Sequence, residues 1–100
     1  MHILIINFNL NGISHEDYVS NCNEIAHIFA DIPGLISKTW LANESTNTYG
    51  GVYFWSSQQS LLDYQDSEVY AQILSNPVFA NPIVTDFANL EGPSAITGGA

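Results

Sequence analysis

The sequence predicts a ferredoxin-like α+β domain of order β-α-β-β-α-β, with a four-stranded antiparallel sheet and both helices on one face. Three observations lead to this fold: an alternating apolar segment near the N-terminus, a helical apolar stripe after it, and an aromatic hairpin in the middle. The chain has 100 residues, of which 46% are apolar, so one domain over residues 1–100 with a modest core is expected.

The first strand is expected over residues 1–10, where Leu4, Ile6 and Phe8 alternate with a face that turns polar at Asn7. A helix then begins at Ser14, which lies three residues before Asp17, a weak form of the capping box. Its apolar stripe suits packing on a sheet and consists of Tyr18, Cys22, Ile25, Phe29 and Ile32. Pro33-Gly34 ends this helix.

The hairpin is expected to pair residues 35–43 with residues 49–56, because β-branched and aromatic residues fill both arms. It holds the chain's only Lys or Arg residue, Lys38, and both of its tryptophans, Trp40 and Trp55. Successive side chains of a strand point to opposite faces, so Lys38 shares a face with Trp40, and Tyr53 shares one with Trp55.

The rest of the chain supplies a second helical segment and the last strand. Residues 57–75 are expected to be helical with a break near Asp66-Ser67, since their apolar period is imperfect. Asn76-Pro77 and Asn81-Pro82 then frame a short loop, and residues 83–90 form the last strand. Residues 92–100 resemble a C-terminal tail that needs a partner surface.

The two faces of the predicted sheet differ in character. An unpaired ammonium is costly to bury, so we assign Lys38 to the face that the helices leave uncovered. That face is expected to carry Asn7, Asn9, Lys38, Trp40, Tyr53 and Trp55, whereas Leu4, Ile6, Phe8, Val52 and Phe54 should face the helices. An aromatic face left in water indicates an interface, so we expect a homodimer that pairs face to face and encloses a cavity.

Charge and composition exclude several classes of protein. One cation against ten acids gives a net charge of -9, which disfavours nucleic acid and membrane partners. No apolar run approaches a membrane span, and a cytoplasmic protein is expected. The lone Cys22 is expected to be a packing residue, and no Cys-x-x-Cys pair exists. His27 and His15 are expected on the surface, because Glu24-x-x-His27 is only half of a di-iron signature.

The hairpin also carries a family resemblance. The chain resembles the YdhR-like mono-oxygenase family of the dimeric α/β-barrel superfamily in Pro33-Gly34-Leu35, Lys38, Trp40, Gly50-Gly51, Tyr53 and Trp55. The resemblance implies a homodimer whose two sheets form a barrel, with a small-molecule pocket between sheet and helices. Related families include cofactor-free oxygenases acting on aromatic polyketides, haem-degrading enzymes and stress-response proteins. Haem-degrading relatives place a histidine on a helix beside the sheet, and residues 57–75 contain none.

Apolar walls with few polar groups are what a planar organic ligand needs, so the hairpin predicts a site. The expected catalytic residues are Lys38, Trp40 and Asn7, and the expected substrate-binding residues are Asn9, Tyr53, Trp55 and Tyr64. Lys38 could stabilise a phenolate, and Asn7 or Asn9 could donate to an oxyanion. The alternative is that these residues form the dimer core, with Lys38 paired to an acid such as Asp86.

Two functions remain open at this level. One is a cofactor-independent mono-oxygenase that acts on a small aromatic or phenolic substrate, with neither cofactor nor metal. The other is a non-catalytic small-molecule binding or stress-response dimer with the same pocket. The fold alone does not choose between them.

Overall fold

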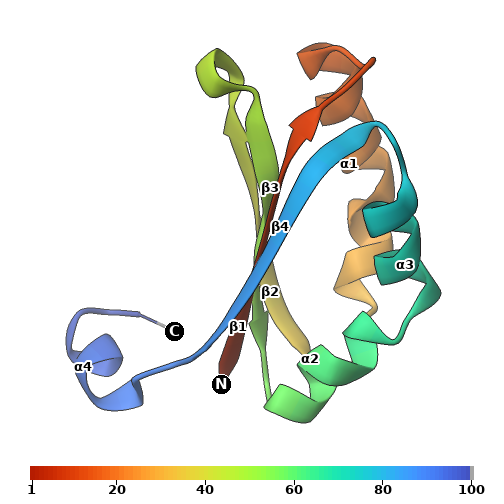
Figure 1. Ribbon diagram of the computed structural model, residues 1–100. Helices are drawn as coiled ribbons and strands as arrows, with labels where there is room; N and C mark the ends of the chain where they lie inside the picture. The colour runs from red at the N-terminus through yellow and green to blue at the C-terminus, as the bar shows by residue number, and fades with distance from the viewer. Residues whose placement is uncertain (100) are drawn as a thin grey trace.

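A computed structural model describes residues 1–99 and contains the predicted sheet and helices. The elements in chain order are β1 His2–Leu10, α1 His15–Ala30, β2 Leu35–Asn43, the short turn η1 Glu44–Thr46, β3 Thr48–Trp55, α2 Gln58–Gln65, α3 Glu68–Ser75, β4 Phe79–Ala88 and α4 Glu91–Ile96. The strands form one antiparallel sheet of order β2-β3-β1-β4. Figure 1 shows α1, α2 and α3 on one face of this sheet, with the other face uncovered. The ferredoxin-like α+β fold is therefore confirmed.

Local sequence signals place the helix ends. The Ser14 hydroxyl accepts a hydrogen bond from the Asp17 amide at 3.1 Å, which satisfies a free donor at the start of α1. Ser57 and Ser67 cap α2 and α3 in the same way, so the predicted break near Asp66-Ser67 is confirmed. Within residues 1–99, the longest apolar stretch of any helix is too short to span a bilayer.

The last strand begins earlier than predicted, at Phe79 instead of residue 83. Asn81 adopts a left-handed φ of 54°, and the pairing with β1 shifts there: Asn7 opposes Ile83, whereas Asn9 opposes Ala80. A bulge on an edge strand tolerates a proline, which lacks the N–H that regular pairing would need. The Asn81-Pro82 pair therefore interrupts the strand's register without ending the strand.

The C-terminal segment that we expected as a tail contains the short helix α4. Glu91 at its start accepts a hydrogen bond from the N-terminal amine at 3.1 Å. Figure 1 shows that α4 stands away from the sheet on its uncovered side. Leu90 and Ile96 remain 73% and 88% exposed, so this segment contributes little to the core.

The predicted facing of the hairpin is wrong. Directly opposed residues of an antiparallel pair share a face, and Tyr53 opposes both Leu4 of β1 and Lys38 of β2. Leu4 is fully buried under the helices, so Lys38, Trp40, Tyr53 and Trp55 face the helices as well. Val52 and Phe54 point to the uncovered face.

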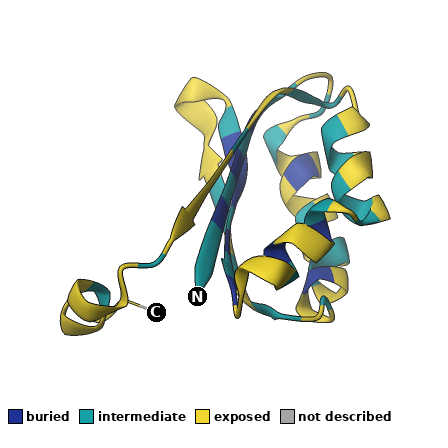
Figure 2. Ribbon diagram, turned by 60° about the horizontal axis from the view of Figure 1, so that its bottom comes forward, coloured by how far each residue is buried: buried dark blue, intermediate teal, exposed yellow. Residues whose placement is uncertain are grey.

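The core lies between the sheet and the helices and is mostly aromatic. Its buried members are Leu4, Ile6, Phe8, Tyr18, Phe29, Tyr49, Tyr53, Trp55, Leu61 and Tyr64. Cys22 and Ile25 pack against them as expected, and so does Ile73 of α3, whereas Leu62 of α2 is 44% exposed. Figure 2 shows buried positions along the middle of the sheet and on the helices, while most of β4 and α4 is exposed.

Gly50 offers a test of the close approach between β3 and β1. Its φ is 146°, and an added Cβ would lie 1.8 Å from the Ile6 carbonyl oxygen, which is backbone and cannot swing aside. We expect Gly50→Ala to lower the free energy of unfolding by at least about 3 kcal/mol. Urea denaturation measures this change.

Gly12→Ala is the matched control, because Gly12 also has a positive φ, 81°, but open space around it. It should lower the free energy of unfolding only by the backbone term of about 1–2 kcal/mol. Equal losses for the two variants would contradict the close approach.

Candidate functional site

The Lys38 ammonium lies among three aromatic rings beneath the helices. Its nitrogen is 3.5 Å from the ring centroid of Phe29, 3.4 Å from that of Trp40 and 4.7 Å from that of Tyr53. Among residues 1–99 it forms neither an ion pair nor a hydrogen bond. Ring faces attract a cation electrostatically, so these three rings replace the acid that a buried lysine usually needs.

The neighbouring strand makes room for this lysine. Trp40 opposes Gly51, and an added Cβ on Gly51 would lie 2.8 Å from Lys38 Cε. The aliphatic stem of Lys38 therefore crosses the space that a side chain at position 51 would fill. This is the structural reason for a glycine inside an otherwise aromatic strand.

The ammonium borders a small cavity of about 40 Å³ between the sheet and α1 and α3. Its wall is mostly apolar and consists of Phe8, Tyr18, Asn21, Cys22, Ile25, Phe29, Lys38, Trp40, Gly50, Tyr53, Ile73 and Phe79. Lys38 is the only member of the wall that carries a full charge in its ordinary state. The cavity has room for water or dioxygen but is far below the roughly 300 Å³ of a site for a drug-sized ligand.

Burial changes the acid–base behaviour of this wall. Removal from water lowers the pKa of Lys38 from 10.5 to about 7, while Cys22 acts in the opposite direction. Burial also raises the pKa of Tyr53 and Tyr18 above the ordinary tyrosine value of 10.0. Near neutral pH, Lys38 can therefore exchange a proton, whereas these tyrosines stay neutral.

Two predicted substrate-binding residues stand behind the cavity wall. The rings of Tyr53 and Trp55 are stacked at 4° with centroids 6.2 Å apart, and Trp55 is fully buried. The Tyr64 hydroxyl donates to the Tyr53 hydroxyl at 3.4 Å. Burial raises the pKa of Tyr64 to about 12. Trp55 and Tyr64 thus hold Tyr53 in place and do not line the cavity.

The two asparagines point to the uncovered face, as the sequence predicted, but Lys38 does not. The Asn7 amide donates to the Tyr49 carbonyl at 3.4 Å, and the Asn9 amide to the Asn47 carbonyl at 2.8 Å. The sheet separates both from the ammonium, so neither can donate to an oxyanion beside Lys38. The expectation that these residues share one site is therefore wrong.

The proposed pairing of Lys38 with Asp86 is not formed. Asp86 instead lies 2.9 Å from the His2 imidazole on the neighbouring strand. His15, expected on the surface, is half-buried and lies 2.7 Å from the Tyr49 hydroxyl. His27 is exposed, as predicted. Residues 1–99 contain no group of three or more His, Cys, Asp or Glu side chains that could hold a metal ion.

Sequence reasoning missed the part of the wall that α1 supplies. Phe29, Tyr18 and Cys22 lie on the apolar stripe that was predicted to pack on the sheet, so their position was correct. Their role was missed because Lys38 was assigned to the other face. A signal for the correct facing was available in β3, where Tyr49, Tyr53 and Trp55 alternate on the face that also holds Gly51.

The lowered pKa of Lys38 predicts a pH dependence of stability. Between about pH 7 and 10.5 the unfolded chain holds the lysine proton and the folded chain has released it, so stability rises with pH. The penalty for burying the ammonium is fully present below pH 7. Lys38→Met removes this contribution, because methionine does not titrate.

Urea denaturation at several pH values from about 6 to 9 tests this, below the range where tyrosines ionise. The stability of wild type relative to Lys38→Met should increase across this range. A constant difference would show that the folded and unfolded chains bind the Lys38 proton equally.

Comparison with solved structures places the fold among oxygenases. SnoaB, a cofactor-independent oxygenase from Streptomyces nogalater, is 15% identical over 89% of this chain and 92% of its own, with a TM-score of 0.69. MhuD, a heme-degrader from Mycobacterium tuberculosis solved with two hemes in its active site, is 16% identical over 90% of this chain and 96% of its own, with a TM-score of 0.71. A putative antibiotic biosynthesis monooxygenase from Deinococcus radiodurans is 10% identical over 89% of this chain and 92% of its own, with a TM-score of 0.73.

At these identities the structures establish the fold alone. No protein of curated function matches the sequence. A family model described as "Putative mono-oxygenase ydhR" matches residues 3–100, which is nearly the whole chain. The chain therefore belongs to the ydhR family of putative mono-oxygenases.

Proposed function

We propose that this protein is a cofactor-independent mono-oxygenase that acts on an electron-rich phenolic substrate. The observation that carries the proposal is the Lys38 ammonium in an apolar cavity, with aromatic rings in place of a counter-ion. A base with a pKa near 7 is well matched to proton transfer at neutral pH. The family match and the fold shared with SnoaB, a cofactor-independent oxygenase, support the same reaction class.

The first step is removal of the phenolic proton. The neutral amine of Lys38 takes this proton, and the resulting ammonium stabilises the phenolate in a mostly apolar site. The apolar side chains of the wall then contact the planar substrate, for which the cavity of about 40 Å³ must widen. The substrate, now electron-rich, is the reductant of dioxygen.

The second step forms and breaks the oxygen bonds. A ring carbon of the phenolate bonds to dioxygen, and the Lys38 ammonium returns its proton to the terminal oxygen of the peroxide. Loss of the ring C–H proton breaks the O–O bond, so that one oxygen atom stays as a carbonyl and the other leaves as water. Phenol and dioxygen thus give quinone and water, and the substrate supplies all four electrons.

Haem does not fit the residues of this cavity. None of the three histidines lines the cavity, so no imidazole is placed to hold a haem iron there. His15 is bonded to Tyr49, and His2 to Asp86. We therefore assign no step to haem, although the fold is shared with the heme-degrader MhuD.

Oxygen consumption tests the proposed reaction. With a panel of naphthols, wild type should consume one dioxygen per quinone formed, and the rate should rise as the pH passes through about 7, where Lys38 loses its proton. Lys38→Met should lower the rate by about 100-fold or more, the usual contribution of a general base. Gln58→Met, at an exposed position on α2 outside the cavity wall, is the control and should keep the wild-type rate.

Naphthol binding without oxygen consumption would contradict catalysis and favour the non-catalytic binding protein. Equal rates for Lys38→Met and wild type would remove Lys38 from the reaction.

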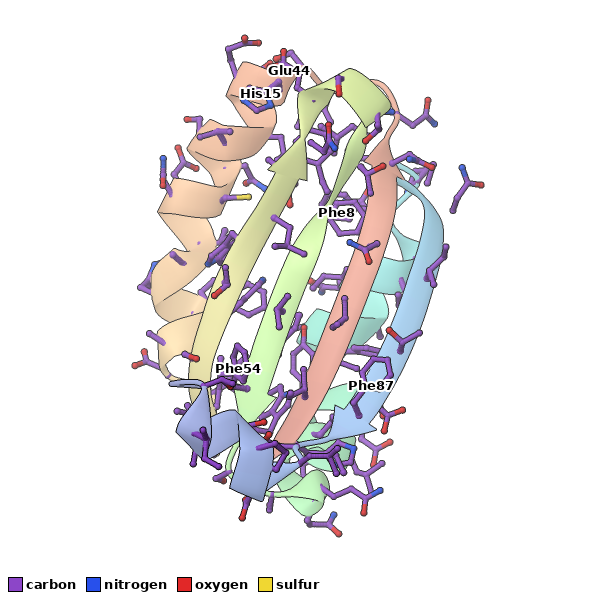
Figure 3. All side chains as sticks on the ribbon, turned by 90° about the vertical axis from the view of Figure 1, so that its left-hand side faces the viewer. Phe8, His15, Glu44, Phe54 and Phe87 are labelled. Atoms are coloured by element: carbon purple, nitrogen blue, oxygen red, sulfur yellow. The ribbon has the colours of Figure 1, made fainter. Side chains whose placement is uncertain are left out.

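We further infer that two copies pair through the uncovered sheet face. Figure 3 looks onto this face and labels Phe54 and Phe87 on it. Ile83 and Phe87 are 63% and 52% exposed, and the strand positions that point to this side carry no charged side chain. In a chain of net charge -9, such a face is where a second copy can approach without repulsion.

Phe87→Asp tests the pairing. A carboxylate buried in an apolar interface is left without a partner, so this variant should sediment as a monomer where wild type sediments as a dimer. Leu62→Asp is the control, since Leu62 is 44% exposed on α2, away from this face. A monomeric wild type at micromolar concentration, or loss of the dimer in both variants, would contradict the inferred interface.

A further inference from the structure

Three hollows meet at the side chain of Trp40. The central one is the cavity beside Lys38. Trp40 also borders an open hollow of about 220 Å³ and another of about 250 Å³, both between α1 and β2. The indole is half-buried. It borders the cavity together with Tyr18 and Cys22 on the side of the first outer hollow, and with Phe29 and Lys38 on the side of the second. Trp40 is the one residue that borders all three, so its side chain decides whether they join into one cleft.

The surroundings of Trp40 leave it room to move. It lies on β2, an edge strand, so only β3 flanks it in the sheet, and its neighbour there is Gly51. On the helix side it meets Phe29 edge to face, with centroids 5.2 Å apart and an interplanar angle of 82°. No hydrogen bond of the indole N–H to residues 1–99 is formed. A change of rotamer there gives up the contacts with Phe29 and with the Lys38 ammonium, and a phenolate bound at Lys38 can replace the latter.

Small side chains line the outer hollows. Ala26 of α1 borders both of them, Ala30 borders one, and Ala42 of β2 borders the other. Larger side chains at these positions would fill the hollows, as side chains fill the rest of the core. Joined to the cavity, the two outer hollows have a combined volume within the range of roughly 300–1,000 Å³ that is typical of ligand sites.

The cleft also differs from the rest of the surface in charge. None of the residues that line the three hollows is an Asp or Glu, and Lys38 is the one Lys or Arg residue in the chain of net charge -9. A phenol that ionises at Lys38 therefore meets no repelling carboxylate in the cleft.

From these observations we infer that the cleft between α1 and β2 is the binding site for fused-ring phenols, and that Trp40 determines which size of ring system enters. The inference rests on the proposed function, because it places the substrate's hydroxyl at Lys38. The remaining rings lie in the outer hollows, along Ala26 and Ala42. A single-ring phenol needs a smaller part of the cleft than a polycyclic phenol, which needs the indole to turn aside.

Binding under argon tests this without any oxygen chemistry. Equilibrium dialysis gives the affinities of phenol, which has one ring, and 1-hydroxypyrene, which has four, and their ratio measures size selectivity. Ala26→Leu fills both outer hollows and should shift this ratio against hydroxypyrene by about tenfold or more. Trp40→Ala should shift it toward hydroxypyrene by a similar factor, and the loss of stacking largely cancels because both probes are aromatic.

Ala71→Leu is the matched control, an exposed alanine on α3 that borders none of the three hollows, and should leave the ratio unchanged. Circular dichroism checks folding, and Trp40→Phe replaces Trp40→Ala should the latter not fold. An equal ratio in Ala26→Leu and Ala71→Leu, an unchanged ratio on shortening Trp40, or no binding of either probe would overturn the inference. Because no oxygen is present, binding that follows this pattern stands even where oxygen consumption fails.

Discussion

The contact between the Lys38 ammonium and three aromatic ring faces is the interaction on which the site depends. It needs Phe29 from α1, Trp40 beside it on β2, and Tyr53 across the hairpin, so it fixes how the helix sits over the edge of the sheet. It also needs Gly51, because a side chain there would occupy the path of the lysine stem. No Asp or Glu residue is buried in residues 1–99, so the acids stay at the surface and Lys38 meets none of them.

The two faces of the sheet carry different sets of side chains. The helix-covered face holds the lysine, the cavity and the cleft, whereas the uncovered face carries apolar and uncharged polar side chains. Because strand alternation separates the two sets, a substitution at Phe87 can alter association without touching the cavity wall. Likewise, a substitution at Ala26 can alter the cleft without touching the uncovered face. The proposed ligand binding and the proposed pairing can therefore be tested independently.

The order of elements was predictable because its signals are local. Ser14 at a helix start, Pro33-Gly34 at a helix end and the Asp66-Ser67 break each act within a few residues. The facing of the hairpin was not predictable in this way. Both of its faces are apolar, and the choice depends on the non-local register that sets Ile6 opposite Gly51.

The rule that a lone ammonium avoids burial led us to place Lys38 on the wrong face of the sheet. Ring faces attract the charged form, and burial lowers the pKa, so the group can also be present as a neutral amine. The sequence did bring Lys38, Trp40 and Tyr53 together correctly, since this follows from pairing within the hairpin. Asn7 was assigned to the same site only because Lys38 and Tyr53 were placed on the wrong face of the sheet. Phe29 was missed for the same reason.

The protonation state of Lys38 is the central claim, and the sequence allows it to be measured directly. With only one lysine in the chain, a protein labelled with ¹³C at lysine Cε gives a single side-chain signal that needs no assignment. Its chemical shift, followed by NMR against pH, should titrate with a midpoint near 7, as burial among the rings requires. A midpoint near the ordinary value of 10.5 would contradict a desolvated lysine and, with it, its role as the base.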